Sequence, residues 1–235
     1  MHKYSVPQHV MDRVLRRQGK PVANEVIDAA RAALVVVDMQ NYFVAEGFPV
    51  EVPLAREIVP NINRMAAAMR AAGGAVIWIQ TTAAGALARW GNHHRYGLKP
   101  DVAATRLAGL AEDAEGFKLY PKLDARSDDL RVKKIKYSAM IPDSSDLHDV
   151  LSRRGIETLL IAGTTTNVCC ESTARDAMMF DYRVVMLSDG NATHTDEEHA
   201  ATLDNFQVFF GDVMTTDEAI ARLARLARVD KSKTA

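Results

Sequence analysis

The chain has 235 residues, a formal net charge of −1 and a hydrophobic content of 48%. This length suits one α/β domain with a large buried core. The near-zero net charge gives no indication of nucleic-acid binding or of attraction to a membrane surface. No apolar run approaches the roughly 20 residues of a membrane span, the N-terminal stretch lacks the apolar core of a signal peptide, and two cysteines are too few for a disulfide-built secreted protein. We therefore expect a cytoplasmic protein.

Residues 1–31 precede the first strongly apolar segment. Val10, Val14 and Leu15 form a short amphipathic pattern beside three arginines, which predicts a surface helix or arm laid against the domain. An arm that contacts a neighbouring subunit is the alternative. We assign residues 1–31 to this arm, residues 32–228 to one domain and residues 229–235 to a flexible tail.

Apolar runs alternate with helical patterns along the rest of the chain. Buried strands are expected at 32–37, 75–79, 158–162 and 183–187, and an alternating strand at 131–136. Helices are expected at 58–72, 101–112, 143–154 and 218–228, and after the two cysteines; a long irregular loop is expected after Gln80. This alternation predicts a single doubly wound, three-layer α/β/α domain with a mostly parallel, roughly six-stranded sheet.

Charged side chains are expected at the carboxyl ends of two of these strands. Asp38 directly follows the 32–37 strand, at the edge where open α/β sheets bind their ligands. Lys134 and Lys136 share one face of the 131–136 strand, and either could reach the same edge. The ordinary interpretation of these lysines is a solvated strand edge.

Two adjacent cysteines follow the 158–162 strand. Asn167 is the expected N-cap of the helix there, which places Cys169 in the first helical turn, where the helix dipole favours the thiolate. Helical spacing places Cys170 on the apolar stripe with Ala174, so we expect Cys170 to pack against the sheet. For Cys169 a structural role is the alternative. Because a cysteine, a carboxylate and a lysine would meet at one sheet edge, the sequence predicts a possible nucleophilic site.

Three segments, VVVDMQNYF, KIKYSAM and GTTTNVCCESTARDA, occur in this order. Together they resemble the isochorismatase-like cysteine hydrolases, whose members include nicotinamidase, N-carbamoylsarcosine amidase and ureidoacrylate amidohydrolase, over about residues 32–216. The resemblance implies a hydrolase that cleaves a C–N bond of a small linear amide or ureide through a thioester and releases ammonia or amine. Nicotinamidases carry an Asp-x-His pattern and further histidines that hold a metal, and nothing after Gln80 reproduces that set, so we expect no metal or cofactor. The resemblance suggests a homodimer or homotetramer.

The resemblance also implies roles for particular residues. Asp38 is the expected general base, Lys134 stabilises the ionised pair and the developing charge, and Cys169 is the expected nucleophile. A cis peptide bond between Thr164 and Thr165 would direct the backbone N–H of Thr165, together with that of Cys169, toward the oxyanion.

Substrate contacts are expected from four side chains, Phe43, Gln80, Trp90 and Tyr137. For His93 and His94 we favour contact with substrate or solvent over metal binding, because adjacent side chains in an extended chain point apart and no Asp-x-His pattern accompanies them. Two alternatives to an amidohydrolase stay open. One is an isochorismatase-type vinyl-ether hydrolase, against which Cys169 argues; the other is a non-catalytic member that uses the fold for binding or assembly.

Overall fold

The computed structural model describes the backbone of residues 1–230 and the side chains of residues 1–223. Residues 229 and 230 belong to the last helix, and the remainder of the predicted tail lies outside the described residues. No helix in the described part of the chain is long and apolar enough to cross a bilayer.

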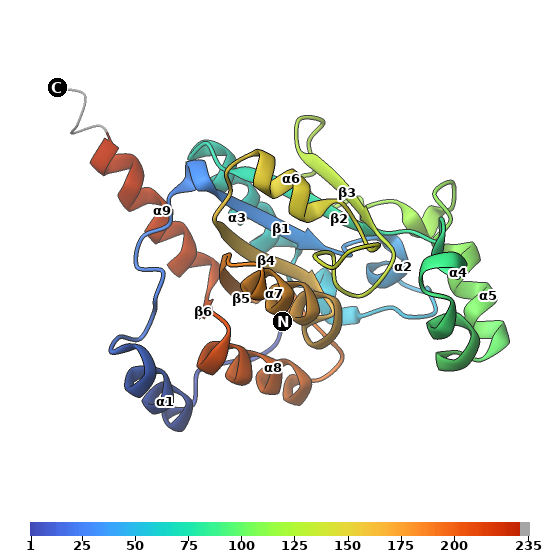
Figure 1. The fold of residues 1–235 in the computed structure, drawn as a ribbon, viewed down its shortest axis with the longest axis horizontal. Helices are drawn as coiled ribbons and strands as arrows, with labels where there is room; N and C mark the ends of the chain where they lie inside the picture. The colour runs from blue at the N-terminus through green and yellow to red at the C-terminus, as the bar shows by residue number, and fades with distance from the viewer. Residues whose placement is uncertain (231–235) are drawn as a thin grey trace.

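Six strands form one sheet, in which every neighbouring pair is parallel (Figure 1). The strands are β1 Ala32–Val37, β2 Ala75–Thr81, β3 Leu130–Lys134, β4 Thr158–Thr164, β5 Arg183–Ala192 and β6 Asp212–Met214. Their order is β3-β2-β1-β4-β5-β6, so β1 and β4 are neighbours at the point where the order reverses. The predicted doubly wound fold is confirmed.

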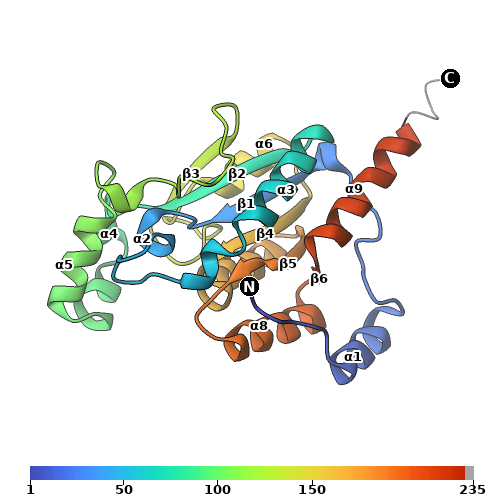
Figure 2. The ribbon, with the colours of Figure 1, turned by 180° about the vertical axis from the view of Figure 1, so that it is seen from behind.

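Helices cover both faces of the sheet (Figures 1 and 2). One face packs against α3 Val59–Ala71 and α9 Thr216–Asp230, and the other against α6 Leu147–Arg153, α7 Glu171–Met179 and α8 Asp196–Phe209. In β1 the side chains of Leu34 and Val36 lie on the face that α3 and α9 cover. The side chains of Val35 and Val37 lie on the face that α6, α7 and α8 cover. The apolar run is continuous because both faces of this strand are buried.

The N-terminal segment contains the helix α1 Gln8–Gln18. Its residues Val10 and Val14 pack against Val208 of α8, so the predicted surface helix is confirmed. Leu15, which we expected on the apolar face, is exposed.

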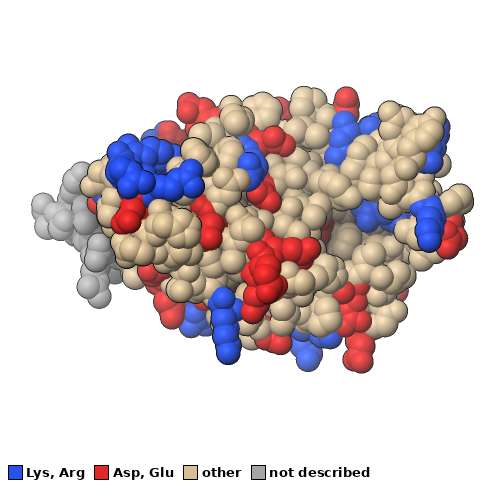
Figure 3. Space-filling model, turned by 90° about the horizontal axis from the view of Figure 1, so that it is seen from below, with Lys and Arg blue, Asp and Glu red and all other residues tan. Residues whose placement is uncertain are grey.

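Several shorter elements lie beyond the carboxyl ends of β1 and β2 (Figure 1). They are α2 Asn41–Val44, α4 Ala86–Arg89, a π-helical turn at His93–Gly97, and α5 Pro100–Gly109. The prediction of an irregular stretch after Gln80 is therefore wrong in part, because one short helix and one turn form within it. The surface seen in Figure 3 consists mostly of side chains other than Lys, Arg, Asp and Glu, with acidic and basic side chains scattered among them and one cluster of basic side chains near an end.

The segment around the cysteines also differs from the prediction. Residues Thr166–Cys170 form a π-helical turn, and α7 begins only at Glu171. Asn167 does not cap the helix; its side-chain oxygen accepts a hydrogen bond from the hydroxyl of Thr193 at 2.7 Å. Neither cysteine therefore lies in the first turn of α7.

Candidate active site

Asp38 and Cys169 lie on either side of the point where the strand order reverses. Asp38 follows β1 and Cys169 lies in the turn after β4. Asp38 has φ +53°, in the left-handed region that aspartate adopts more readily than most residues. Its backbone N–H donates to the Ile79 carbonyl at 3.0 Å, which attaches this turn to β2.

Lys134 reaches Asp38 from a strand that is not its neighbour. Two inter-strand spacings separate β3 from β1, roughly 10 Å, and a four-carbon side chain can bridge much of that distance. The Lys134 Nζ lies 2.8 Å from Asp38 Oδ2 and donates to Thr81 Oγ1 at 2.7 Å. The Thr81 hydroxyl in turn donates to Asp38 Oδ1 at 2.8 Å. Asp38 and Lys134 are each 1% exposed, so this is a fully buried and hydrogen-bonded ion pair.

The thiol of Cys169 completes the cluster. Its Sγ lies 3.5 Å from Lys134 Nζ, and the residue is almost completely buried. The predicted convergence of an acid, a lysine and a cysteine at one edge of the sheet is present. Of the two candidate lysines, Lys134 makes these contacts, whereas the Lys136 amine lies 3.4 Å from the Pro142 carbonyl.

The protonation of this cluster differs from the expectation for Cys169. Burial raises the pKa of the Cys169 thiol to about 12; the charge of Lys134 lowers this pKa, and the charge of Asp38 and its hydrogen bond to the thiol raise it. Burial alone would lower the pKa of the Lys134 ammonium. The negative charges of Asp38 and Cys169 outweigh burial, so the pKa of Lys134 is raised. The raised pKa acts against the expected thiolate and favours the neutral thiol, so attack by Cys169 requires a base.

Cys170 lies in a different environment. It is fully buried in the core cluster beneath α7, with its Sγ 4.0 Å from the Ala162 carbonyl, which confirms the predicted packing against the sheet. The peptide bond between Thr164 and Thr165 is cis, as the sequence resemblance implied.

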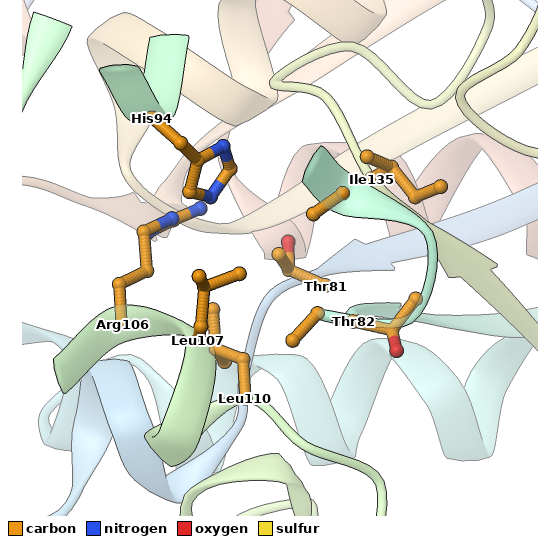
Figure 4. A pocket seen from close by; sticks show the side chains of 9 residues that line it. Thr81, Thr82, His94, Arg106, Leu107, Leu110 and Ile135 are labelled. Atoms are coloured by element: carbon orange, nitrogen blue, oxygen red, sulfur yellow. The ribbon is translucent and has the colours of Figure 1, made fainter. Parts of the chain in front are cut away.

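A pocket adjoins this cluster at Thr81. Figure 4 shows Arg106 extending from α5 toward His94, with Thr81 and Ile135 on the opposite side. The complete lining is Thr81, Thr82, Ala83, Ala86, His94, Arg106, Leu107, Leu110 and Ile135. Thr81 both lines this pocket and bonds to Asp38 and Lys134, so the pocket borders the buried ion pair, but its side chains leave no space for a water molecule.

The four side chains predicted to contact substrate do not line this pocket. Trp90 and Tyr137 lie beside it, with ring centroids 4.7 Å apart. Burial raises the pKa of Tyr137. The charge of Cys169 also raises this pKa and the charge of Lys134 lowers it, so Tyr137 is near the cluster. The side-chain amide of Gln80 donates to the Phe117 carbonyl at 2.9 Å instead. Phe43 packs edge-on against Tyr42 and against the core, so both side chains make contacts within the protein, and their contact with substrate stays a prediction.

The two neighbouring histidines belong to the same aromatic group. His93 stacks on Trp90 with ring centroids 3.8 Å apart, and burial lowers the pKa of His93. His94 is buried, lines the pocket, and its Nδ1 lies 3.1 Å from the Trp90 carbonyl. Among the described residues, no group of three or more His, Cys, Asp or Glu side chains is arranged to hold a metal ion.

Comparison with known proteins agrees with this geometry. The Isochorismatase domain family matches residues 32–218. The ureidoacrylate amidohydrolase RutB of Variovorax paradoxus is 35% identical over 228 residues, covering 90% of this chain and 88% of the relative. RutB of Yersinia enterocolitica is 33% identical over 234 residues, covering 92% and 99%. The crystal structure of a cysteine hydrolase from Pseudomonas syringae pv. phaseolicola gives a TM-score of 0.78 at 31% identity, covering 88% of this chain and 99% of that one.

The chain belongs to the isochorismatase family. It is an isochorismatase-like cysteine hydrolase with the fold that the three sequence segments implied.

Two residues near the site of this isochorismatase-family hydrolase were missed by sequence reasoning. Thr81 ends β2 at the same edge as Asp38, so its place after an apolar strand could have identified it. Arg106 occupies the buried side of α5 together with Ala103, Leu107 and Leu110, at helical spacing. An arginine within an apolar stripe was the pattern that could have revealed it.

Proposed function

We propose that this isochorismatase-family protein is a cysteine amidohydrolase that cleaves a C–N bond of a small linear ureide or amide. The single observation that carries the proposal is the buried contact of Lys134 Nζ with both Asp38 Oδ2, at 2.8 Å, and Cys169 Sγ, at 3.5 Å. Relatives that match almost the whole chain are ureidoacrylate amidohydrolases, which supports a ureide substrate.

In the proposed reaction Asp38 removes the proton from the Cys169 thiol as the sulfur attacks the substrate carbonyl carbon. A base is required because burial raises the pKa of the thiol and so favours its protonated form. Lys134 is paired with Asp38 before the attack and offsets the negative charge that develops during it. The backbone N–H groups of Thr165 and Cys169 would donate to the carbonyl oxygen in the tetrahedral adduct.

The adduct then collapses to an acyl thioester. The C–N bond breaks, and the departing nitrogen takes the proton held by Asp38 and leaves as ammonia or amine. For a ureide the enzyme-bound species is a thiocarbamate. Water, deprotonated by Asp38, attacks this carbonyl carbon, the C–S bond breaks, and the proton returns to the sulfur of Cys169.

The adjacent cysteines provide a matched pair of variants for the test. Cys169→Ala should lower ammonia release from carbamoyl amino acids and other ureides by at least about 1000-fold, because the nucleophile is lost. Cys170→Ala should retain most of the activity, since that thiol only fills space in the core, although its thermal stability should fall. A slow substrate should add an acyl group to Cys169 that mass spectrometry detects.

The opposite pattern, with Cys170 essential and Cys169 dispensable, would contradict the proposal. Retained turnover in Cys169→Ala, together with no covalent adduct on the wild-type protein, would favour the vinyl-ether hydrolase chemistry. A folded protein that is inactive on every amide and ureide would favour the non-catalytic alternative.

We also propose that the protein is cytoplasmic, as its sequence leads us to expect. On the basis of the family resemblance, we propose that it assembles as a homodimer or homotetramer. The proposed domain comprises residues 32–228, with residues 1–31 as its N-terminal arm. Light scattering should give twice or four times the mass of one chain.

A further inference from the structure

The N-terminal residues lie between β5 and α8 (Figure 2), and His2 contacts both sides. Its side chain is completely buried, and both of its ring nitrogens have partners. The Nδ1 atom lies 2.7 Å from Asp196 Oδ1 at the start of α8. The Nε2 atom accepts a hydrogen bond of 3.0 Å from the backbone N–H of Thr193, which follows β5. A ring that accepts at Nε2 carries its proton on Nδ1 and donates it to Asp196.

His2 is connected in this way to the turn that carries the proposed nucleophile. The first two residues of that turn each form one side-chain hydrogen bond. Thr166 Oγ1 lies 2.9 Å from Nδ1 of His199, and the ring of His199 stacks on the ring of His2 with centroids 4.3 Å apart. Asn167 Oδ1 accepts a hydrogen bond of 2.7 Å from the hydroxyl of Thr193. Both contacts of the turn therefore lead to a residue that His2 holds.

The turn determines where the reacting atoms of the proposed mechanism lie. It places the Cys169 thiol 3.5 Å from Lys134 Nζ, and it contains the Cys169 N–H, a proposed donor to the oxyanion. The N–H groups of Val168 and Cys170 share one acceptor, the Thr165 carbonyl, each at 3.2 Å. A single π-helical turn is a rare backbone shape, so we expect its side-chain contacts to help maintain it. Small displacements of reacting atoms have large effects on rate.

His2 is held in place independently of the active site. Two residues further along, the hydroxyl of Tyr4 donates to Asp204 Oδ1 at 2.9 Å, and the Tyr4 ring packs edge-on against His199 with centroids 6.0 Å apart. Next along the chain, α1 packs against Val208. Terminal segments are ordered only where such contacts attach them. Three attachments to α8 therefore keep the His2 ring in its buried position.

We propose that His2 is a positioning residue: it holds His199 and Thr193, and through them the turn that places the Cys169 thiol. This inference rests on the proposed amidohydrolase function and adds the N-terminal segment to the groups on which its rate depends. His2 itself does not touch the reacting atoms. The alternative is that His2 only stabilises the fold, and the two roles differ in their effect on kcat.

Three variants separate these roles. His2→Phe keeps a ring that can stack on His199 but removes both polar contacts. His2→Gln removes the ring, but its side-chain oxygen can accept a hydrogen bond from the Thr193 N–H. Val14→Ala removes buried methyl groups from α1, so it weakens the attachment of the same segment away from the turn. If His2→Phe does not fold, His2→Leu replaces it, since leucine fills space without a polar atom.

Kinetics are compared at a temperature well below the lowest melting temperature of the set. In His2→Phe we expect kcat for the best ureide to fall by about 10- to 100-fold with less than about a 3-fold change in KM, because a displaced thiol slows the attack and leaves binding intact. His2→Gln should recover most of the lost kcat. Val14→Ala should retain the wild-type kcat although its melting temperature falls.

Hydrogen exchange of the turn provides a measurement that needs no substrate. In His2→Phe the backbone N–H groups of Thr166–Cys170 should exchange at least about 10-fold faster than in the wild-type protein, the effect of losing one buried hydrogen bond. They should exchange at the wild-type rate in Val14→Ala. Mass spectrometry of peptides that contain the turn measures both rates.

The inference is overturned if His2→Phe lowers kcat no more than Val14→Ala does, or if kcat is equal in His2→Phe and His2→Gln. Unchanged hydrogen exchange of the turn in His2→Phe would also overturn it. Loss of ureide hydrolysis in Cys169→Ala would leave the proposed function standing in each of these cases. If no ureide or amide releases ammonia, the proposed function fails, and hydrogen exchange then decides separately whether His2 holds the turn.

Discussion

The hydroxyl of Thr81 organises the buried charges. It accepts a hydrogen bond from Lys134 and donates its only proton to Asp38 Oδ1. Because the Oδ1 atom is satisfied in this way, Asp38 Oδ2 faces the Lys134 ammonium. One small side chain therefore fixes the orientation of the carboxylate that the proposed mechanism uses as a base, without itself touching the reacting atoms.

Replacement of Thr81 by valine tests this positioning role. Valine keeps the shape of threonine but cannot donate to Asp38 or accept from Lys134, so each loses a buried hydrogen bond. We expect kcat for the best ureide to fall by about 10- to 100-fold with a small change in KM, and the pH dependence of kcat to shift. Thr81→Ser, which keeps the hydroxyl, should restore most of the rate. If valine and serine give the same kcat, the hydroxyl has no positioning role.

Individual site residues were predictable to different degrees. Asp38 could be predicted because it follows a continuous apolar strand in a sheet whose carboxyl edge binds ligands. Strand alternation could not distinguish Lys134 from Lys136, because the strand ends at Lys134 and only the fold shows where the chain turns. Arg106 depends on the packing of α5 against elements far away in the sequence, and no local pattern reports which charged side chains find a partner.

At the scale of elements, α5 is positioned by a contact between a glycine and an aromatic ring. A Cβ added at Gly109 would lie 2.5 Å from the Cε2 atom of Tyr42. The ring of Tyr42, a residue of α2, therefore packs directly on the backbone at the end of α5. Gly116 packs against the end of α5 itself, since a Cβ there would clash with the Gly109 carbonyl oxygen and lie 3.2 Å from the Cδ2 atom of Tyr42. The helix that carries Arg106 is held beside the sheet edge by this close approach.

Gly109→Ala should therefore move α5 or the Tyr42 ring. Overpacking of this kind typically costs about 1–3 kcal/mol, so the melting temperature should fall. Because α5 lines the pocket that borders Thr81, its displacement should also lower kcat/KM for the best ureide. Ala104→Ser, on the exposed side of α5, is the matched control and should change neither quantity. Unchanged stability in Gly109→Ala would show that the ring has room to move.

Elements were predictable where local pattern and burial agree. The strands at 32–37 and 75–79 could be predicted because both their faces are covered. The three residues of β6 could not, because so short a segment is a strand only through its pairing with β5. The continuation of β5 through Ser188 to Ala192 was missed because its polar residues do not resemble a buried strand; the Asn191 side chain donates to the carbonyls of Ile161 and Leu187.

At the scale of the whole molecule, histidines connect the N-terminus with the turn that carries Cys169. His2 stacks on His199 with ring centroids 4.3 Å apart and accepts a hydrogen bond from the Thr193 N–H at 3.0 Å. The two ring nitrogens of His199 lie 2.9 Å from Thr166 Oγ1 and 3.0 Å from the Ser188 carbonyl. A neutral His199 that donates to the carbonyl and accepts from the hydroxyl satisfies both contacts.

This arrangement predicts a loss of stability in acid. Burial and the neighbouring His2 lower the pKa of His199 to about 4 from an unperturbed 6.5. Between these values the unfolded chain binds a proton that the folded protein does not, so the free energy of unfolding decreases as the pH falls from about 6.5 to 4, by about 3 kcal/mol at most. Above pH 6.5 both states are neutral at this residue, and it adds no pH dependence.

Denaturant unfolding at several pH values measures this contribution. The decrease between pH 6.5 and 4 should be smaller in His199→Gln, whose side chain cannot take up a proton. The exposed His9→Gln is the control and should retain the wild-type decrease. Equal slopes in all three proteins would show that His199 is not the group responsible.

The backbone at Asp38 also limits what can be learned by mutating it. Asparagine and glycine tolerate a φ of +53°, whereas alanine disfavours it. Alanine scanning at this position would therefore mix a conformational penalty with the removal of the carboxylate, and low activity would have two causes. Asparagine preserves the turn and removes only the charge, so it isolates the chemistry. Only a side chain that both tolerates this backbone and carries a carboxylate meets the two requirements.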